Sequence, residues 1–272
     1  MEETKKQYYR VLTIAGSDPS GGAGIQADIK AISAMGCYAA SAITSVVNEN
    51  TVGVYGVHDI PVDFVRGQVE SVLDDIGVDA IKIGMLHSPE LTHEIANLLR
   101  EREIKNVVLD PVMVATSGGD LMLNEAIDVL KKELIPLARI ITPNIPEAER
   151  LLGGRSITSV DEMKDAASEL TDLGTSVLLK GGHLKGDVMI DVLCNLETMQ
   201  RLELPSDRVK TENTHGTGCT LSSAIASGLA KGKALTPAVI AAKEYITGAI
   251  AAGADYEIGK GHGPVCHFWR QW

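Results

Sequence analysis

The sequence predicts an α/β protein with a mostly parallel central sheet that is covered by helices on both faces. Short apolar runs rich in Val and Ile alternate along the chain with longer segments of helical, amphipathic periodicity. Strands that are apolar on both sides are typical of parallel sheets buried between two helical layers. With 272 residues and no internal repeat or change of composition, we expect one domain over residues 1–272, with a loose N-terminal extension over residues 1–8.

The individual elements follow from the apolar spacing and from Pro and Gly near their ends. Pro opens several helix candidates, and Gly36 ends the first of them. In chain order we expect strands over residues 10–15, 38–47, 80–85, 106–110, 139–142, 176–180, 188–193 and 200–204. Between and after them we expect helices over residues 22–35, 61–76, 89–101, 124–134 and 160–173, a helix after Pro146, and helices that begin at residues 218 and 236.

The composition excludes several classes of partner. A net charge of −11 offers no basic surface for a nucleic acid or an anionic membrane. Residues 1–7 are too charged for a signal peptide, and no apolar run is long enough to span a bilayer. The four cysteines, Cys37, Cys194, Cys219 and Cys266, form no CxxC pair that would indicate a zinc site or a disulfide framework. We therefore expect a cytoplasmic protein.

Residues 214–220 (THGTGCT) are the strongest candidate for a binding site. The small residues at 216–218 leave backbone N–H groups free, and the apolar run that follows is typical of a buried helix. Free amides and the positive end of a helix dipole favour a bound anion. Cys219 lies at the helix start, where a thiolate is also favoured. The alternative is a glycine-containing loop before an ordinary core helix.

Residues 16–28 carry the pattern G-x-G-x-x-A at Gly22, Gly24 and Ala27, which is the form of a dinucleotide-binding turn. Glu49 lies about where the ribose-binding acid of such a site is expected. Against this interpretation, a polar loop separates the strand from Gly22. The alternatives are a loop that closes over a small polar substrate, with Asp28 contacting it, and a helix start with incidental glycines.

Polar residues also follow other strands, where the ligands of open α/β sheets bind. Asn144 and Glu147 either hold Mg²⁺ or form a helix capping box, and Asp110 is either a turn residue or a metal and phosphate contact. Lys180 is either a phosphate-binding cation or a solvated side chain. His183 and His215 are acid–base candidates, although loop histidines are more often only hydrogen-bonded.

Several segments together closely resemble hydroxymethylpyrimidine/phosphomethylpyrimidine kinases of thiamine biosynthesis, over nearly the whole chain. The segments are residues 15–28 (AGSDPSGGAGIQAD), 82–86 (KIGML), 110–113 (DPVM), 142–148 (TPNIPEA), 180–183 (KGGH), 213–220 (NTHGTGCT) and 259–265 (GKGHGPV). The resemblance implies a ribokinase-like three-layer α/β/α sandwich and a cytoplasmic homodimer. It also implies two successive ATP- and Mg²⁺-dependent phosphorylations, first of the 5-hydroxymethyl group of the aminopyrimidine and then of its monophosphate.

The resemblance assigns roles residue by residue. It implies that Gly216, Thr217, Gly218 and Cys219 hold the transferring phosphoryl group, with Cys219 where sugar kinases of this fold place a catalytic aspartate. It implies that Gly16, Asp28, Met85 and Val112 surround the pyrimidine. It implies that the nucleotide and its phosphates meet Asp110, Asn144, Lys180, Thr214 and Lys243, and that Asp110 and Glu147 hold Mg²⁺.

One residue departs from the family pattern. Glu49 stands where family members often carry Gln, and an ionised carboxylate cannot donate a hydrogen bond as an amide does. We expect Glu49 to read the aminopyrimidine edge with the help of a proton, on either the carboxyl group or the ring.

Three other functions remain open from the sequence: pyridoxal kinase, which shares this fold, an NAD-dependent oxidoreductase and a non-catalytic nucleotide sensor. Residues 117–120 and 183–187 are candidate lids because they are polar and glycine-rich.

Overall fold

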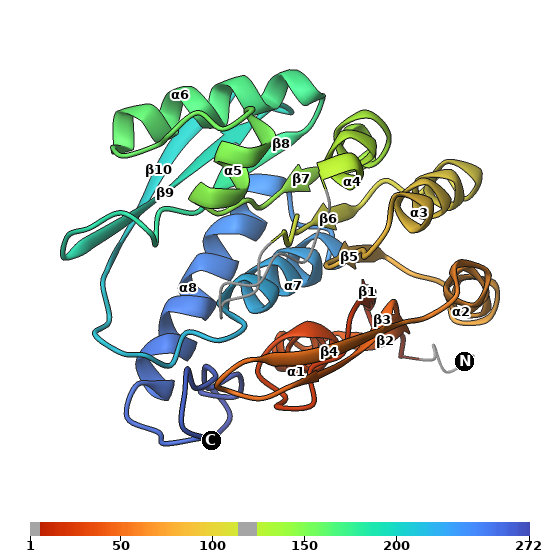
Figure 1. Ribbon diagram of the computed structural model, residues 1–272, viewed down its shortest axis with the longest axis horizontal. Coiled ribbons are helices and arrows are strands. Elements are labelled where there is room, and N and C mark those ends of the chain that lie inside the picture. Colours follow the sequence, from red (N-terminus) through yellow and green to blue (C-terminus); the bar gives the residue numbers. More distant parts are fainter. Residues whose placement is uncertain (1–5, 114–123) are drawn as a thin grey trace, which may run out of the picture.

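The computed structural model describes residues 6–113 and 124–272. An eight-stranded sheet with the order β10-β9-β8-β7-β6-β5-β1-β2 forms its centre, and β3 and β4 form a separate two-stranded ribbon (Figure 1). The sheet strands are β1 (Arg10–Ala15), β2 (Tyr38–Ile43), β5 (Ala80–Ile83), β6 (Val107–Leu109), β7 (Ile140–Ile141), β8 (Ser176–Leu179), β9 (Val188–Asn195) and β10 (Gln200–Asp207). The six strands from β2 to β8 in this order pair in parallel, while β9 and β10 are antiparallel.

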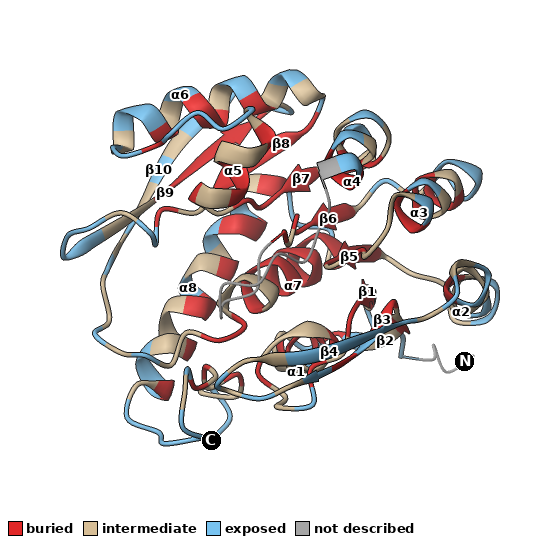
Figure 2. Ribbon diagram, viewed as in Figure 1, coloured by how far each residue is buried: buried red, intermediate tan, exposed pale blue. Residues whose placement is uncertain are grey.

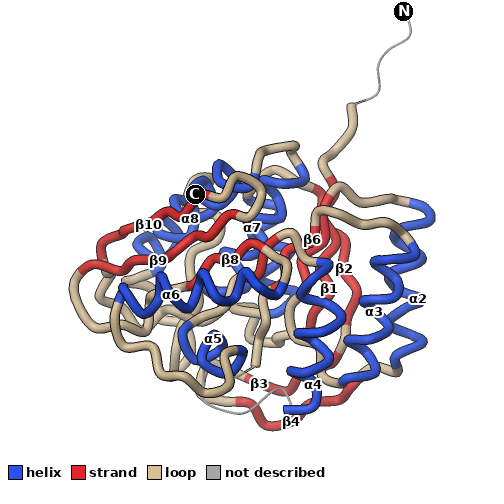
Figure 3. Tube along the Cα trace, turned by 90° about the horizontal axis from the view of Figure 1, so that it is seen from above, coloured by secondary structure: helices blue, strands red, loops and turns tan. Residues whose placement is uncertain are grey.

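Helices connect these strands and cover both faces of the sheet. They are α1 (Gly24–Ala34), α2 (Val62–Asp75), α3 (Pro89–Glu101), α4 (Asn124–Val129), α5 (Ile145–Leu151), α6 (Val160–Leu170), α7 (Thr217–Ala230) and α8 (Leu235–Gly253), with short turns η1 (Leu130–Leu134), η2 (Ile135–Leu137) and η3 (Thr171–Leu173). In Figure 3, α2 and α3 lie on one side of the strands and α7 and α8 on the other. The predicted three-layer α/β/α architecture is thus confirmed, and none of the helices in the two described segments meets the length and hydropathy needed to cross a membrane.

The strand expected over residues 38–47 is wrong in one respect, because the chain leaves the sheet at Thr44. The Thr44 N–H donates to the carbonyl of Ala15, whereas its own carbonyl accepts from the N–H of Ile60. The following strand, β3 (Ser45–Glu49), pairs with β4 (Val54–Asp59), which was not expected because most of its side chains are exposed. The sequence does not show where β2 ends and β3 begins, because the residues on both sides of Thr44 are similarly apolar and β-branched. Glu49 consequently lies on this ribbon and not at the end of a sheet strand.

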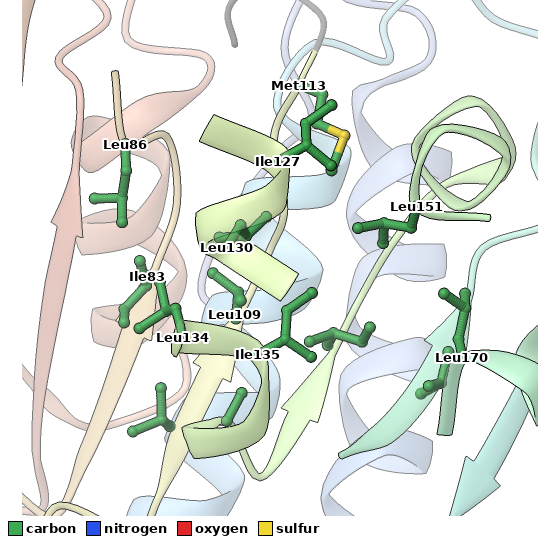
Figure 4. Close-up of a cluster of buried hydrophobic side chains, with 14 of the residues drawn as sticks. Ile83, Leu86, Leu109, Met113, Ile127, Leu130, Leu134, Ile135, Leu151 and Leu170 are labelled. Carbon is green, nitrogen blue, oxygen red and sulfur yellow. The ribbon is translucent and has the colours of Figure 1, made fainter. Parts of the chain in front are cut away.

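Alternation along each strand divides the core into two layers. Leu12, for example, packs with helices α2 and α3, whereas its neighbour Val11 faces α1, α7 and α8. In Figure 4, Leu130 and Leu134 lie beside Ile83 and Leu109 of the sheet. Figure 2 shows the result, with buried strands at the centre and exposed outer helix faces. Successive side chains of a strand point to opposite faces, so each strand contributes to both layers.

Helix α7 packs across the middle of the sheet, against β1, β5 and β6. All its residues from Thr220 to Ala230 are buried. Small side chains allow this position: a Cβ at Gly228 would lie 2.9 Å from the Cβ of Ala238 on α8. The first turn of α7 is therefore held at the carboxyl ends of the central strands, where ligands of open α/β sheets bind.

Candidate active site

A cavity of about 680 Å³ opens at this edge of the sheet. Apart from Asp28, every site residue expected from the sequence lines it. These residues are Gly16, Glu49, Met85, Asp110, Val112, Asn144, Glu147, Lys180, Thr214, Gly216, Thr217, Gly218, Cys219 and Lys243. They come from segments throughout the chain, and the parallel topology brings them to one edge. Of the two candidate lids, residues 117–120 lie outside the described residues.

The glycine loop before α7 packs closely against its neighbours. Gly216 has φ +76°, and a Cβ there would lie 1.8 Å from the carbonyl oxygen of Gly22. A Cβ at Gly218 would lie 3.2 Å from Lys180 Nζ and 3.3 Å from Asp110 Oδ2. The first turn of a helix leaves backbone N–H groups without intrahelical partners, and here a lysine ammonium lies beside them. An anion bound at this turn would meet the amides, the helix dipole and Lys180 together.

We expect Gly216→Ala to destabilise the protein and to impair the site. Left-handed backbone costs a non-glycine residue about 1–2 kcal/mol, which corresponds to a fall in Tm of roughly 2–8 °C, and the contact with Gly22 adds to this. Gly232→Ala is a matched control, because Gly232 also has φ +76° but nothing within 4 Å of its Cβ position. Calorimetry compares the two variants, and equal losses of Tm would contradict a tight contact at Gly216.

Asp110 and Lys180 form an ion pair at the centre of the cavity. Lys180 Nζ donates to Asp110 Oδ1 at 2.9 Å, and Thr142 Oγ1 donates to the same oxygen at 2.9 Å. Burial alone would raise the pKa of Asp110, but the ammonium groups of Lys180 and Lys82 hold it below its usual value. Asp110 is therefore ionised, and Lys180 is fixed where a phosphate would need a cation.

Asn144 and Glu147 form the capping box that the sequence left as one alternative. Asn144 Oδ1 accepts from the Glu147 N–H at 2.9 Å, and a Glu147 carboxylate oxygen accepts from the Asn144 N–H at 2.7 Å. Burial, with the nearby charge of Asp110, raises the pKa of Glu147 to about 7, against the opposing effect of Lys180. An ionised Asp110 beside a buried Glu147 whose charge it disfavours fits a divalent cation, which would favour the ionised form of Glu147 as well.

Asp28 does not contact the cavity, contrary to expectation. Its side chain is fully buried, and its oxygens accept from Thr13 Oγ1 at 2.6 Å, Lys82 Nζ at 2.8 Å and Ser223 Oγ at 2.8 Å. The sequence led us to expect that Asp28 contacts the substrate, but it could not show that Lys82 would lie between Asp28 and the ligand space. Lys82 lines the cavity in its place.

Cys219 lies in the cavity wall, but the expectation of a favoured thiolate is wrong for this structure. Burial raises the pKa of the Cys219 thiol to about 12. Lys82 and a hydrogen bond from the Gly24 N–H act in the opposite direction, whereas Asp28 and Asp110 add to the rise. Because the sulfur is removed from water, burial disfavours the thiolate more than the positive end of the helix favours it.

A second group of polar side chains surrounds Glu49. The Asp18 carboxylate accepts from the N–H groups of Ser20 at 2.7 Å and Ala23 at 2.6 Å, and it pairs with His215 Nε2 at 2.9 Å. Atoms of Asp18, Glu49 and His215 lie within 4.8 Å of one another. Burial and the charge of Asp18 raise the pKa of Glu49 to about 7, with His215 opposing them. Glu49 is therefore close to half protonated at neutral pH.

His215 also accounts for the glycine at position 22. A Cβ at Gly22 would lie 2.4 Å from His215 Cδ2, so the imidazole occupies the space beside this turn. A dinucleotide-binding turn needs that space for close approach of the pyrophosphate. The geometry thus opposes the dinucleotide interpretation and places His215 as the partner of Asp18.

The other end of the cavity is held by Lys243 and Arg208. Lys243 Nζ donates a hydrogen bond to Asp191 Oδ2 at 2.5 Å, and Asp191 Oδ1 accepts from the Gly181 N–H at 2.8 Å. The Arg208 guanidinium donates to carbonyls of the loop at residues 182–186. Of these residues, the resemblance assigned only Lys243 to the nucleotide.

Lys82 and Asp191 line the cavity, although neither was expected from the sequence to have a role there. Each interrupts an otherwise apolar strand, as in the AIKI of β5. A charge in a buried strand is costly unless it is paired, so this pattern was an available signal for a functional or buried ion pair.

Fold and cavity together define a class of protein. The carboxyl edge of the mostly parallel sheet brings together a helix N-terminus, two lysines and two buried carboxyl groups. This combination of groups is typical of the active site of a phosphotransferase. The family model described as phosphomethylpyrimidine kinase matches residues 18–266. The chain belongs to the phosphomethylpyrimidine kinase family.

Similar proteins agree with this assignment. A hydroxymethylpyrimidine/phosphomethylpyrimidine kinase of Rhizobium meliloti is 50% identical over 96% of this chain and 97% of its own length. Among solved structures, phosphomethylpyrimidine kinase of Clostridium difficile has 47% identity and a TM-score of 0.77, covering 89% of this chain and 99% of that one. An ADP complex of Bacillus subtilis pyridoxal kinase has 38% identity and a TM-score of 0.89, covering 97% and 99%. The ribokinase-like fold expected from the resemblance is thus confirmed.

Proposed function

We propose that the protein transfers the γ-phosphoryl group of ATP to the hydroxymethyl group of 4-amino-5-hydroxymethyl-2-methylpyrimidine, and then phosphorylates the monophosphate. The observation that carries this proposal is the convergence at the first turn of α7. Gly218 is close to both Lys180 Nζ and Asp110 Oδ2, and Cys219 follows it in the same cavity wall. Phosphoryl transfer depends mainly on positioning and charge neutralisation, and this turn supplies both.

The chain's own groups would act on the reacting atoms as follows. The amides at residues 216–218 and the Lys180 ammonium hold the equatorial oxygens of the phosphoryl group. The hydroxyl oxygen bonds to the γ-phosphorus as the bond to the bridging oxygen of ADP breaks. The hydroxyl proton passes to Cys219 Sγ in its thiolate form, or the neutral thiol only orients the hydroxyl and the proton passes to an oxygen of the transferred phosphoryl group. Glu147 and Asp110 would hold Mg²⁺, which neutralises phosphate charge when bound.

At the substrate end, Gly16, Met85 and Val112 would surround the pyrimidine ring, as the resemblance implies. Gly16 lets Met85 approach the backbone closely, because a Cβ at position 16 would lie 2.8 Å from the terminal methyl of Met85. Glu49 would face the polar edge of the ring. At the other end, Asn144, Thr214 and Lys243 would contact the nucleotide and its phosphates.

A coupled assay of ADP formation tests this proposal. With ATP and Mg²⁺, we expect turnover on the aminopyrimidine and then on its monophosphate, and none without substrate. An absence of ADP formation with both aminopyrimidines would refute the proposal and leave a nucleotide sensor. Pyridoxal is the second substrate to compare, because the structural neighbours include a pyridoxal kinase. A higher kcat/KM for pyridoxal would favour that function.

We also propose a homodimer that works in the reducing cytoplasm. The β3–β4 ribbon exposes the apolar side chains of Val46, Tyr55 and Val57, and Phe64 at the start of α2 is 66% exposed. Exposed apolar surface of this kind is typical of an interface. Light scattering on the full chain would give twice the mass of one chain, and Val46→Asp would lower it. A mass of one chain for the wild type would refute the dimer.

A further inference from the structure

Lys82 is a charged residue at the centre of the sheet to which no role has been assigned. It lies on β5 with its side chain fully buried, yet it lines the cavity. A Cβ at Gly84 would lie 2.8 Å from Lys82 Nζ. Because residues 82 and 84 point to the same face of the strand, the ammonium occupies the space that Gly84 leaves open. It therefore reaches toward the carboxyl end of β5, where the cavity lies.

The ammonium is held there by its hydrogen bond to Asp28, which is itself held by two further hydrogen bonds. Lys82 Nζ donates to Asp28 Oδ2 at 2.8 Å, and Thr13 Oγ1 donates to the same oxygen at 2.6 Å. Asp28 Oδ1 accepts from Ser223 Oγ at 2.8 Å. Ser223 is one helical turn after Cys219, so both side chains lie on the same face of α7. The buried pair thus lies against the helix face that carries Cys219.

We propose that Lys82, held by Asp28, is a positioning residue that provides the positive charge beneath Cys219 and stabilises the thiolate that accepts the substrate's proton. The proposal rests on the proposed function. The ammonium keeps its own proton throughout, and the proton that moves is that of the substrate hydroxyl, which passes to Sγ as the oxygen bonds to phosphorus.

Only some of the charged residues near Cys219 favour a negative charge on its sulfur. Asp28 from α1 and Asp110 after β6 oppose a negative charge on the sulfur. Lys82 from β5 and Lys180 after β8 favour it. Lys180 is already paired with Asp110 and lies beside Gly218, where the transferring phosphate would bind. Lys82 is also paired, with Asp28, but this pair lies against the face of α7 that carries Cys219 and not beside Gly218, so within the described part of the site we assign Lys82 to the sulfur.

The test compares the double variant, Lys82→Met with Asp28→Asn, with Asp28→Asn alone, because Asp28 itself opposes the thiolate and these two variants differ only in the charge at position 82. We expect kcat on the aminopyrimidine to fall about a hundredfold, with KM changed less than about threefold. Without substrate, we expect alkylation of Cys219 by iodoacetamide at pH 8, followed by peptide mass spectrometry, to slow at least about tenfold. Thr13→Val is the matched control, because it removes one hydrogen bond of Asp28 and no charge.

The two measurements separate failure of this inference from failure of the proposed function. If the wild type forms no ADP, the proposed function fails, and the alkylation rate still decides whether Lys82 acts on the sulfur. An unchanged alkylation rate overturns the inference, as does an unchanged kcat. A fall in kcat that Thr13→Val reproduces would show a purely structural role and also overturn it. If circular dichroism shows the double variant to be unfolded, Lys82→Gln, whose amide can still donate to Asp28, takes its place in both measurements.

Discussion

Replacing Cys219 with alanine is expected to lower kcat by about 10²–10⁴-fold while the KM for the aminopyrimidine changes little. The side chain lines the cavity at the first turn of α7, beside the glycines that would hold the phosphoryl group. A group that takes or orients a proton acts mainly in the transition state, so its loss reduces turnover more than binding. Steady-state kinetics with saturating ATP measure both constants, and an unchanged kcat would remove Cys219 from the mechanism.

Two further variants separate the two roles of Cys219. Serine keeps a hydroxyl that can orient the substrate but is a much poorer base, whereas aspartate supplies a base. If Cys219 accepts the proton, Cys219→Ser will be as impaired as the alanine variant and Cys219→Asp will retain more activity. If the thiol only orients the hydroxyl, serine will retain most of kcat. Because burial raises the pKa of the thiol to about 12, the base role also predicts that kcat of the wild type rises with pH.

Glu49 is expected to make substrate binding depend on pH. The group's pKa is raised to about 7, so it is mostly protonated below this pH and mostly ionised above it. Contact with the aminopyrimidine edge requires one proton, carried by the carboxyl group or by the ring. The KM should therefore rise about tenfold for each pH unit above about 7, or roughly a hundredfold by pH 9. KM measured from pH 6 to pH 9 tests this.

Glu49→Gln is the matched control for this prediction. Its amide both donates and accepts without titrating, so its KM should vary much less over the same range. His215 and Asp18 face this position in both proteins. Burial opposes it, but Asp18 and Glu49 together raise the pKa of His215, so the substitution also lowers the pKa of that imidazole, and the weaker pH dependence that remains in Glu49→Gln is assigned to His215. Parallel profiles for the wild type and Glu49→Gln would show that Glu49 does not read the ring.

Much of the site could be predicted because parallel strands end at one edge. Asp110, Asn144 and Lys180 each follow an apolar strand in the sequence, and the structure brings all three to one cavity. The expectation that Asp28 contacts the substrate was wrong, since its place near the start of a helix does not show which side chain separates it from the cavity, and that side chain is Lys82. The sequence also could not show that Lys243 pairs with Asp191, because contacts between residues 52 apart depend on packing.

The amino-acid sequence by itself determined the α/β class, the succession along the chain of the strands that form the central sheet, and the glycine loop before α7, because these follow from local periodicity and backbone freedom. It also carried the motifs that mark the kinase family. Only the tertiary structure decided that the chain leaves the sheet at Thr44, that Asp28 and Lys82 form a buried pair, and that burial raises the pKa of the Cys219 thiol. These features depend on contacts between segments that are distant in the chain, and those contacts also decide which charged groups are shielded from water.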